Sequence, residues 1–328
     1  MRRMRTRCVV HAVARDLGLS VTSVETVTTP TVISSDRRIV MTIKSFIQRH
    51  PVIAFYSLTF AISWGACLAI LGPGGFLSTS STSPSFMLAI GVGPLGPLLA
   101  GILLTAVVDG RPGLRDLLSG LQLGRARTRW YAVALLTFPL LSTAVILALS
   151  ITSPTFLPAI VTTDDRAGLV LMAVVIGLMV NVCEEPGWTG FVTPRLLRGH
   201  GVLATGLFMG LLWGTWHLPA FAGSAASSGP IPAPLYMAAL LFGWLVPYRV
   251  LMVWVYDRTH SLLVAILMHL PADVWGLILV PTITGTAMLS YLVAFGGALW
   301  VVVAVVALAN GGRLTRAEGR AVTQAMAA

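Results

Sequence analysis

The chain has 328 residues, of which 56% are hydrophobic and only 10% are charged, and its 22 basic and 12 acidic side chains give a formal net charge of +10. Its mean hydropathy is +0.85. Soluble domains carry about 25% charged residues, and disordered chains have low hydrophobicity. The composition therefore excludes both a soluble globular protein and a chain that is disordered throughout.

The chain begins with a polar segment, residues 1–40, which holds seven arginines and three acidic residues. It lacks the apolar core and small-residue cleavage site of a signal peptide. We expect a disordered basic tail or a mis-called start, with Met41 as the alternative first residue. A protease-like membrane domain is expected over residues 41–312, with a short cytoplasmic tail over 313–328.

Eight apolar blocks follow the tail, and each has about the 20 residues that a membrane-spanning helix needs. The alternating pattern of a membrane β-barrel is absent, so helices are the remaining way to span the bilayer. We therefore expect an all-α, polytopic membrane protein with about eight transmembrane helices. The blocks are about 51–71, 86–108, 130–150, 169–191, 202–221, 234–254, 260–280 and 287–309.

The connectors between the blocks alternate in charge. One set of helix ends carries thirteen basic residues, and the other set carries only Arg166. Because basic residues favour the cytoplasmic side, we expect both termini to be cytoplasmic. The chain is rich in Arg and nearly free of Lys, which is typical of a high-GC bacterium, so we expect a multi-pass protein of a bacterial plasma membrane.

Few ionisable residues lie inside the blocks, and such residues are costly at membrane depth, so each is a candidate functional residue. Arg249 lies near a cytoplasmic helix end and is expected to extend toward the membrane surface. The remaining five candidates are Glu184, Glu185, His217, His269 and Asp273.

The candidates lie on three blocks, and prolines follow them closely. Pro186 follows the two glutamates and is expected to break that helix, because proline removes a backbone hydrogen bond. His217 lies four residues after Trp213, and Asp273 lies four residues after His269, so each pair shares a helix face. Pro219 and Pro271 are expected to kink the other two helices and help to open a cavity.

Glutamate and two histidines in a wet membrane cavity favour activation of water. A buried carboxylate can act as a general base, a neutral histidine can share the proton, and a second histidine can stabilise an oxyanion. The predicted reaction class is amide hydrolysis. We interpret Trp188, Trp213 and Trp216 as packing or interface residues.

The motifs that carry these residues resemble those of the CPBP family, the CAAX-protease and bacteriocin-processing intramembrane proteases that are also called the Abi family. The resemblance covers about residues 45–310 and implies an intramembrane endopeptidase. The motifs are Glu184-Glu185-x-x-Trp188-x-Gly190-Phe191, Trp213-x-x-x-His217 and His269-x-x-x-Asp273, with Pro-Leu-Gly-Pro at 94–97 and Tyr256-Asp-Arg-Thr259 in addition.

The resemblance implies a role for each candidate. Glu184 and His217 would activate the water, Glu185 would organise the site, and His269 with Asp273 would stabilise the oxyanion. The family is often described as metalloproteases, and Zn²⁺ held by Glu184, His217 and His269 is chemically reasonable. A metal-free mechanism uses the same residues and is equally open.

Two positions depart from the family pattern. Thr189 stands where the family usually has an arginine that can pair with the second glutamate. Glu185 therefore needs a hydrogen bond from Thr189, a partner such as Arg249, or a proton. Asp273 stands where the family often has asparagine, so it either shares a proton or orients His269.

Two other classes of function are compatible with these residues. Buried Glu, His and Asp also form proton relays in transporters, and the missing arginine is compatible with a non-catalytic membrane scaffold derived from the protease. The expected partners are the lipid bilayer and a secreted-peptide or membrane-protein substrate. Without residues 1–40 the net charge falls to 15 − 9 = +6, which gives no case for nucleic-acid binding.

Overall fold

The computed structural model describes residues 43–75, 83–226 and 231–310, together with 79, 229 and 314–315. The expected basic tail at 1–40 and nearly all of the expected tail at 313–328 lie outside the described residues. The described residues from Lys44 onward form one compact unit. The described part of the chain consists of helices joined by turns and short loops and contains no β-strand, which confirms the predicted all-α class.

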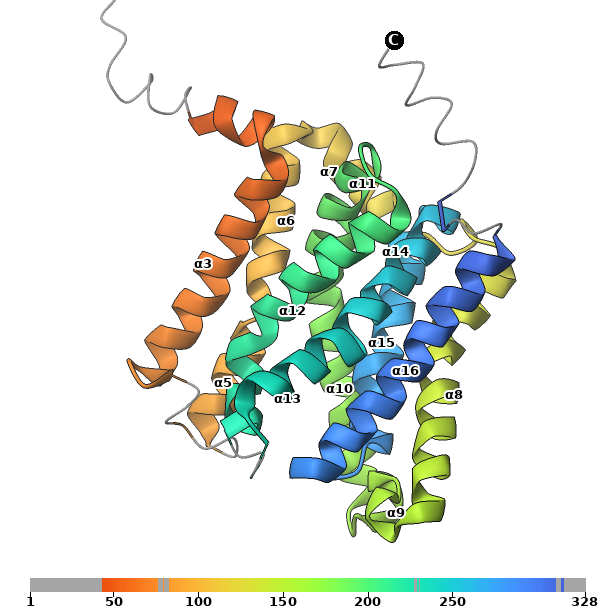
Figure 1. Cartoon of the computed structure of the whole chain (residues 1–328). Helices are drawn as coiled ribbons and strands as arrows, with labels where there is room; N and C mark the ends of the chain where they lie inside the picture. The colour runs from red at the N-terminus through yellow and green to blue at the C-terminus, as the bar shows by residue number, and fades with distance from the viewer. Residues whose placement is uncertain are drawn as a thin grey trace, which may run out of the picture. The chain divides into compact units, whose positions relative to one another are not determined.

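The helices that form this unit follow one another with short connections (Figure 1). Those of the first half are α3 (Pro51–Leu71), α5 (Pro84–Val92), α6 (Leu95–Val108), α7 (Gly110–Ser119), α8 (Thr128–Thr152), η1 (Pro154–Phe156), α9 (Ala159–Thr162) and α10 (Arg166–Glu185). Those of the second half are η2 (Pro186–Val192), α11 (Thr193–Leu197), α12 (Val202–Ala226), α13 (Ala233–Leu240), η3 (Leu241–Leu245), α14 (Val246–Thr259), α15 (Leu262–Leu279) and α16 (Gly285–Ala309).

Seven helical segments of the described residues are long and apolar enough to cross a membrane. They coincide with seven of the eight predicted blocks, and the eighth block, 202–221, forms the 25-residue helix α12, which is not among the seven. The segment Ala233–Thr259 is 61% buried, more than any other. Helix α14 therefore lies inside the bundle, packed against α12 and α15.

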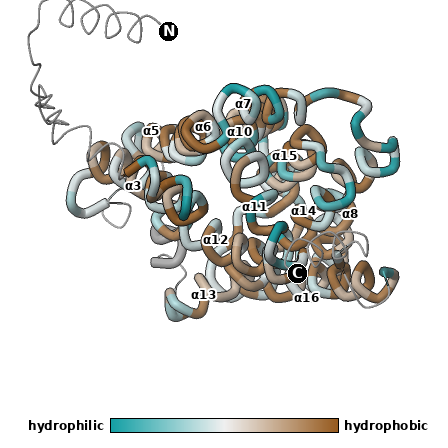
Figure 2. The backbone as a smooth tube through the Cα atoms, turned by 90° about the horizontal axis from the view of Figure 1, so that it is seen from above, coloured by the Kyte–Doolittle hydropathy of each residue, from teal (hydrophilic) through white to brown (hydrophobic). Residues whose placement is uncertain are grey.

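The connectors that hold the basic residues gather at one end of the bundle, here called the basic end. Arg195 of α11 pairs with Asp109, which precedes α7. The turn after α7 bonds to the start of α15, and Arg258 at the end of α14 donates to Asn310 Oδ1 after α16 over 3.0 Å. Figure 2, which looks onto this end, shows hydrophilic residues in α7. Helices α5 and α9 lie at the other end (Figure 1).

The predicted break at Pro186 is wrong, because the helix changes type there and does not end. The segment Arg166–Leu197 runs on as one helical span, but residues Pro186–Val192 form a π-helix between α10 and α11. A π-helix bonds residues five apart and is frequent at functional sites. Its wider turns accommodate the proline without ending the helix, and Pro186 begins this wider segment directly after Glu185.

The π-helix packs directly on the backbone of α6 through two glycines. A methyl group added to Gly101 would lie 2.7 Å from the Cα atom of Gly187, and one added to Gly187 would collide with the carbonyl oxygen of Pro97 and with the ring of Phe55. Any larger residue would push the two segments apart. This contact therefore fixes the height and angle at which the two glutamates enter the bundle.

The close contact between α6 and the π-helix predicts the effect of a single methyl group. We expect Gly187→Ala to lower the free energy of unfolding by about 1–3 kcal/mol, the usual cost of overpacking a tight interior. Gly297→Ala is the matched control, because a methyl group there meets nothing within 4 Å. Thermal unfolding of the purified proteins in detergent compares the two, and equal stabilities would contradict the assigned contact.

Candidate active site

Glu184 is the last residue but one of α10 and accepts hydrogen bonds from two indoles. Trp213 Nε1 of α12 donates to Glu184 Oε2 over 2.9 Å, and Trp188 Nε1 of the π-helix donates to the same oxygen over 3.2 Å. The carboxyl group is buried, with 1% of the residue exposed. Both donors are neutral, so they orient one oxygen without adding a positive charge.

Glu185 belongs to a different set of contacts, although it is the next residue. Arg249 of α14 donates from Nη1 and Nη2 to Glu185 Oε1 over 3.2 Å each, and both side chains are fully buried. Thr189 Oγ1 donates to Glu185 Oε2. Glu185 therefore has two of the three alternatives predicted in place of the usual arginine, the hydrogen bond from Thr189 and the ion pair with Arg249. The expectation that Arg249 extends to the membrane surface is wrong, because its side chain is fully buried.

His269 connects Glu185 to Asp273 on α15. Its Nδ1 lies 2.8 Å from Glu185 Oε1, and its Nε2 lies 3.7 Å from Asp273 Oδ2. Because a carboxylate accepts hydrogen bonds, the Nδ1 atom carries a proton toward Glu185. Asn181 Nδ2 donates to Asp273 Oδ2 over 2.7 Å, so this carboxyl oxygen is already an acceptor.

His217 is held by the backbone of its own helix, α12. Its Nδ1 lies 2.8 Å from the carbonyl oxygen of Trp213, and a carbonyl only accepts, so Nδ1 is the protonated nitrogen. The Nε2 atom of neutral His217 is then a free base. The ring is enclosed by Trp213, Trp216 and Phe221, with ring centroids 4.8, 4.7 and 5.8 Å away. Pro219 lies inside α12, as Pro271 lies inside α15, and neither ends its helix.

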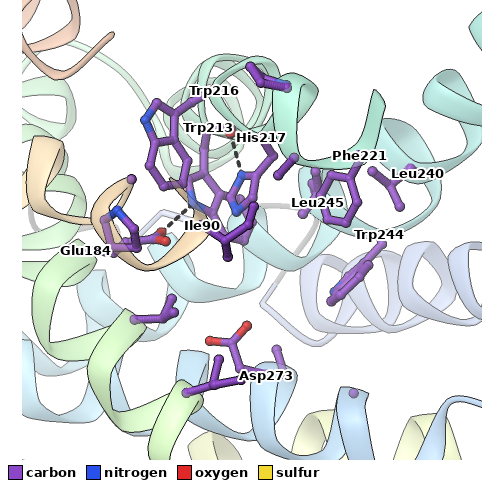
Figure 3. Close-up of a pocket in the computed structure, with 18 of the residues that line it drawn as sticks. Ile90, Glu184, Trp213, Trp216, His217, Phe221, Leu240, Trp244, Leu245 and Asp273 are labelled. Carbon is purple, nitrogen blue, oxygen red and sulfur yellow. Dashed lines mark hydrogen bonds between the residues drawn. The ribbon is translucent and has the colours of Figure 1, made fainter. Parts of the chain in front are cut away.

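A cavity of about 530 Å³ brings these residues together. Four of the five predicted site residues line it, namely Glu184, His217, His269 and Asp273, while Glu185 lies behind them. Figure 3 shows Glu184, His217 and Asp273 directed into one space from α10, α12 and α15. About a quarter of the Asp273 side chain is exposed, so the carboxyl group reaches the open volume.

Sequence reasoning missed three contributors to this site. Trp188 and Trp213 were expected to pack only, but their indole N–H groups bind Glu184. Asn181 was given no role, although it is a polar residue one helical turn before the glutamates and binds Asp273. A polar residue within an apolar span was the available signal for Asn181. The Trp213 contact depends on which helices face each other, whereas the signal for Trp188 was its spacing of four residues from Glu184.

The residues expected to bind a metal are not arranged as a metal site. Among the described residues, no group of three His, Cys, Asp or Glu side chains is placed to hold a metal ion. Glu184 Oε2 is bound by two indoles, and the Nδ1 atom of His269 faces Glu185. The described residues therefore form no assembled three-ligand site, and we derive no step through a metal.

Comparison with known families finds a match over the segment that holds the site. Residues 166–275 match the family model described as "Type II CAAX prenyl endopeptidase Rce1-like". This model represents CPBP intramembrane proteases. The match confirms the resemblance to the CPBP family. The match covers about a third of the chain, from the start of α10 into α15. It includes all five candidate residues. No curated protein matches the chain.

The buried Arg249–Glu185 pair predicts a large effect of removing one partner. We expect Arg249→Met to lower the free energy of unfolding by about 3–5 kcal/mol, because an unpaired carboxylate is left in the bundle interior. Adding Glu185→Gln to this variant removes the uncompensated charge and should restore a large part of the stability. Denaturation in detergent measures both variants, and a double variant as unstable as Arg249→Met would contradict the pairing.

Proposed function

We propose that this CPBP-type membrane protein is an intramembrane endopeptidase that hydrolyses a peptide bond with water activated by Glu184 and His217. The observation that carries the proposal is the shared cavity: a buried carboxylate and a histidine with an unprotonated Nε2 line the same space. A secreted peptide or a membrane protein is the proposed substrate. We propose a plasma-membrane location with both termini in the cytoplasm.

The proposed reaction begins with a water molecule between Glu184 and the scissile carbonyl. The water oxygen attacks the carbonyl carbon while Glu184 takes the proton, and the C–N bond breaks as Glu184 passes that proton to the leaving nitrogen. His217 supplies a second acceptor for the water through Nε2. The two indoles hold Glu184 Oε2 in place during both transfers.

The oxyanion of the tetrahedral intermediate is the proposed partner of His269. A protonated His269 has a carboxylate beside each ring nitrogen, Glu185 at Nδ1 and Asp273 near Nε2. Its positive charge is therefore held in the cavity wall, where low polarity strengthens its attraction for an oxyanion. Asp273 accepts from Asn181, which supports an orienting role for this carboxyl group.

The proposal predicts that Glu184→Gln lowers the cleavage rate at least 100-fold, the scale of general-base catalysis. Purified protein in lipid, incubated with a peptide library, measures the rate, and the products are identified by mass spectrometry. Asp164→Asn is the matched control, because this acid is exposed between α9 and α10 and its loss should change nothing. Equal cleavage by Glu184→Gln and wild type would refute the mechanism.

A second experiment separates the metal-free reaction from Zn²⁺ catalysis. We expect cleavage to persist after dialysis against a chelator, because the described residues do not form a three-ligand site. The treated protein is assayed with and without added Zn²⁺. Loss of activity that only added metal restores would mean that Glu184, His217 and His269 gather around the ion on binding.

A further inference from the structure

The cavity extends from the candidate catalytic residues in one direction only, away from the basic end. Helices α12 and α15 run away from that end, and their lining residues begin at the catalytic level and continue beyond it, to Phe221 and Val280. Helix α10 runs toward the basic end, and its lining residues, Ile176, Val180 and Glu184, end at the catalytic level. All three helices therefore place the open volume on the same side.

The remaining walls agree with this direction. The described lining residues include members of α5, α13 and the first turns of α16, and none belongs to α7, α11 or α14. On the basic side the site is sealed by packed aromatic rings. Phe55 and Phe191 stack with centroids 5.7 Å apart, Trp188 packs against Phe55 at 5.1 Å, and all three side chains are fully buried.

The chemistry of the walls limits what the cavity can hold. The described lining residues include two acidic side chains, Glu184 and Asp273, and no lysine or arginine. Away from these acids the walls are aromatic and aliphatic, with Phe221 and Trp244 among the residues that Figure 3 labels. Beyond the catalytic level these walls offer a free C-terminal carboxylate no lysine or arginine, and burying a charge there without a partner is costly.

We infer that the substrate enters from the end of the bundle opposite the basic connectors and that the part held in the cavity is an uncharged, apolar peptide segment, cut at an internal bond. This inference rests on the proposed function. Since basic connectors favour the cytoplasm, the entrance faces the exterior side of the membrane. Exported peptides and the outer parts of membrane segments are the substrates that reach it.

The direction of entry is measured by labelling, without any need for cleavage. In a chain with Cys8, Cys67 and Cys183 replaced by serine, Ala220→Cys places one thiol in the cavity wall, one turn beyond His217. A charged, membrane-impermeant thiol reagent is added to right-side-out and to inside-out vesicles. We expect labelling at least 10-fold faster in right-side-out vesicles. Faster labelling in inside-out vesicles would overturn the inferred direction.

The matched control is Gln122→Cys in the same serine background. Gln122 is an exposed residue of the turn after α7, at the basic end, so its thiol should react faster in inside-out vesicles. The two thiols are expected to show opposite preferences. Equal preferences would place the cavity and the basic connectors on the same face and would overturn the inference.

The occupant is tested by protection of the same thiol. An amidated peptide of alternating leucine and alanine should slow the labelling of Ala220→Cys at least fivefold, and a peptide of equal length with a lysine or aspartate at its centre should not. Equal protection by the charged peptides would overturn the apolar assignment. Cleavage of the amidated peptide by wild-type protein in micelles tests the proposed function separately, because both faces are accessible there.

Discussion

The buried ion pair between Arg249 and Glu185 is the interaction on which the arrangement of the site depends. Both side chains are fully buried, and removing charges from water is compensated only by close geometry and additional hydrogen bonds. Glu185 meets this requirement with four donors on three different elements, since Thr189 and His269 contribute as well. The pair therefore ties α10, the π-helix, α14 and α15 to one point.

Arg249 also affects Glu184, through the indole of Trp213. Its guanidinium lies 4.2 Å from the ring centroid of Trp213, a distance at which the cation is attracted to the face of the indole. Trp213 in turn donates to Glu184. Two adjacent glutamates thus share one cation but differ in their contacts: Glu185 is paired with the charge, and Glu184 is left with neutral donors beside an open volume.

Much of this could be predicted from the sequence, because hydropathy and helical spacing are local properties. The spans, the shared face of His269 and Asp273, and the need of Glu185 for a new partner all follow from residues close together in the chain. The π-helix at Pro186 and the indole donor from Trp213 could not be predicted in this way. They depend on how α6 and α12 approach α10. Arg249 lies 64 residues from Glu185, yet it was one of the partners predicted for this carboxylate, because a buried acid that lacks the usual arginine needs another cation.

Trp213 has a further consequence through its two polar groups. Its indole N–H binds Glu184, while its backbone carbonyl binds Nδ1 of His217. One residue therefore fixes the spacing between the proton acceptor and the histidine, as a rigid template would. Trp213 and His217 move together with α12, and the indole hydrogen bond is the link that keeps Glu184 of α10 aligned with them.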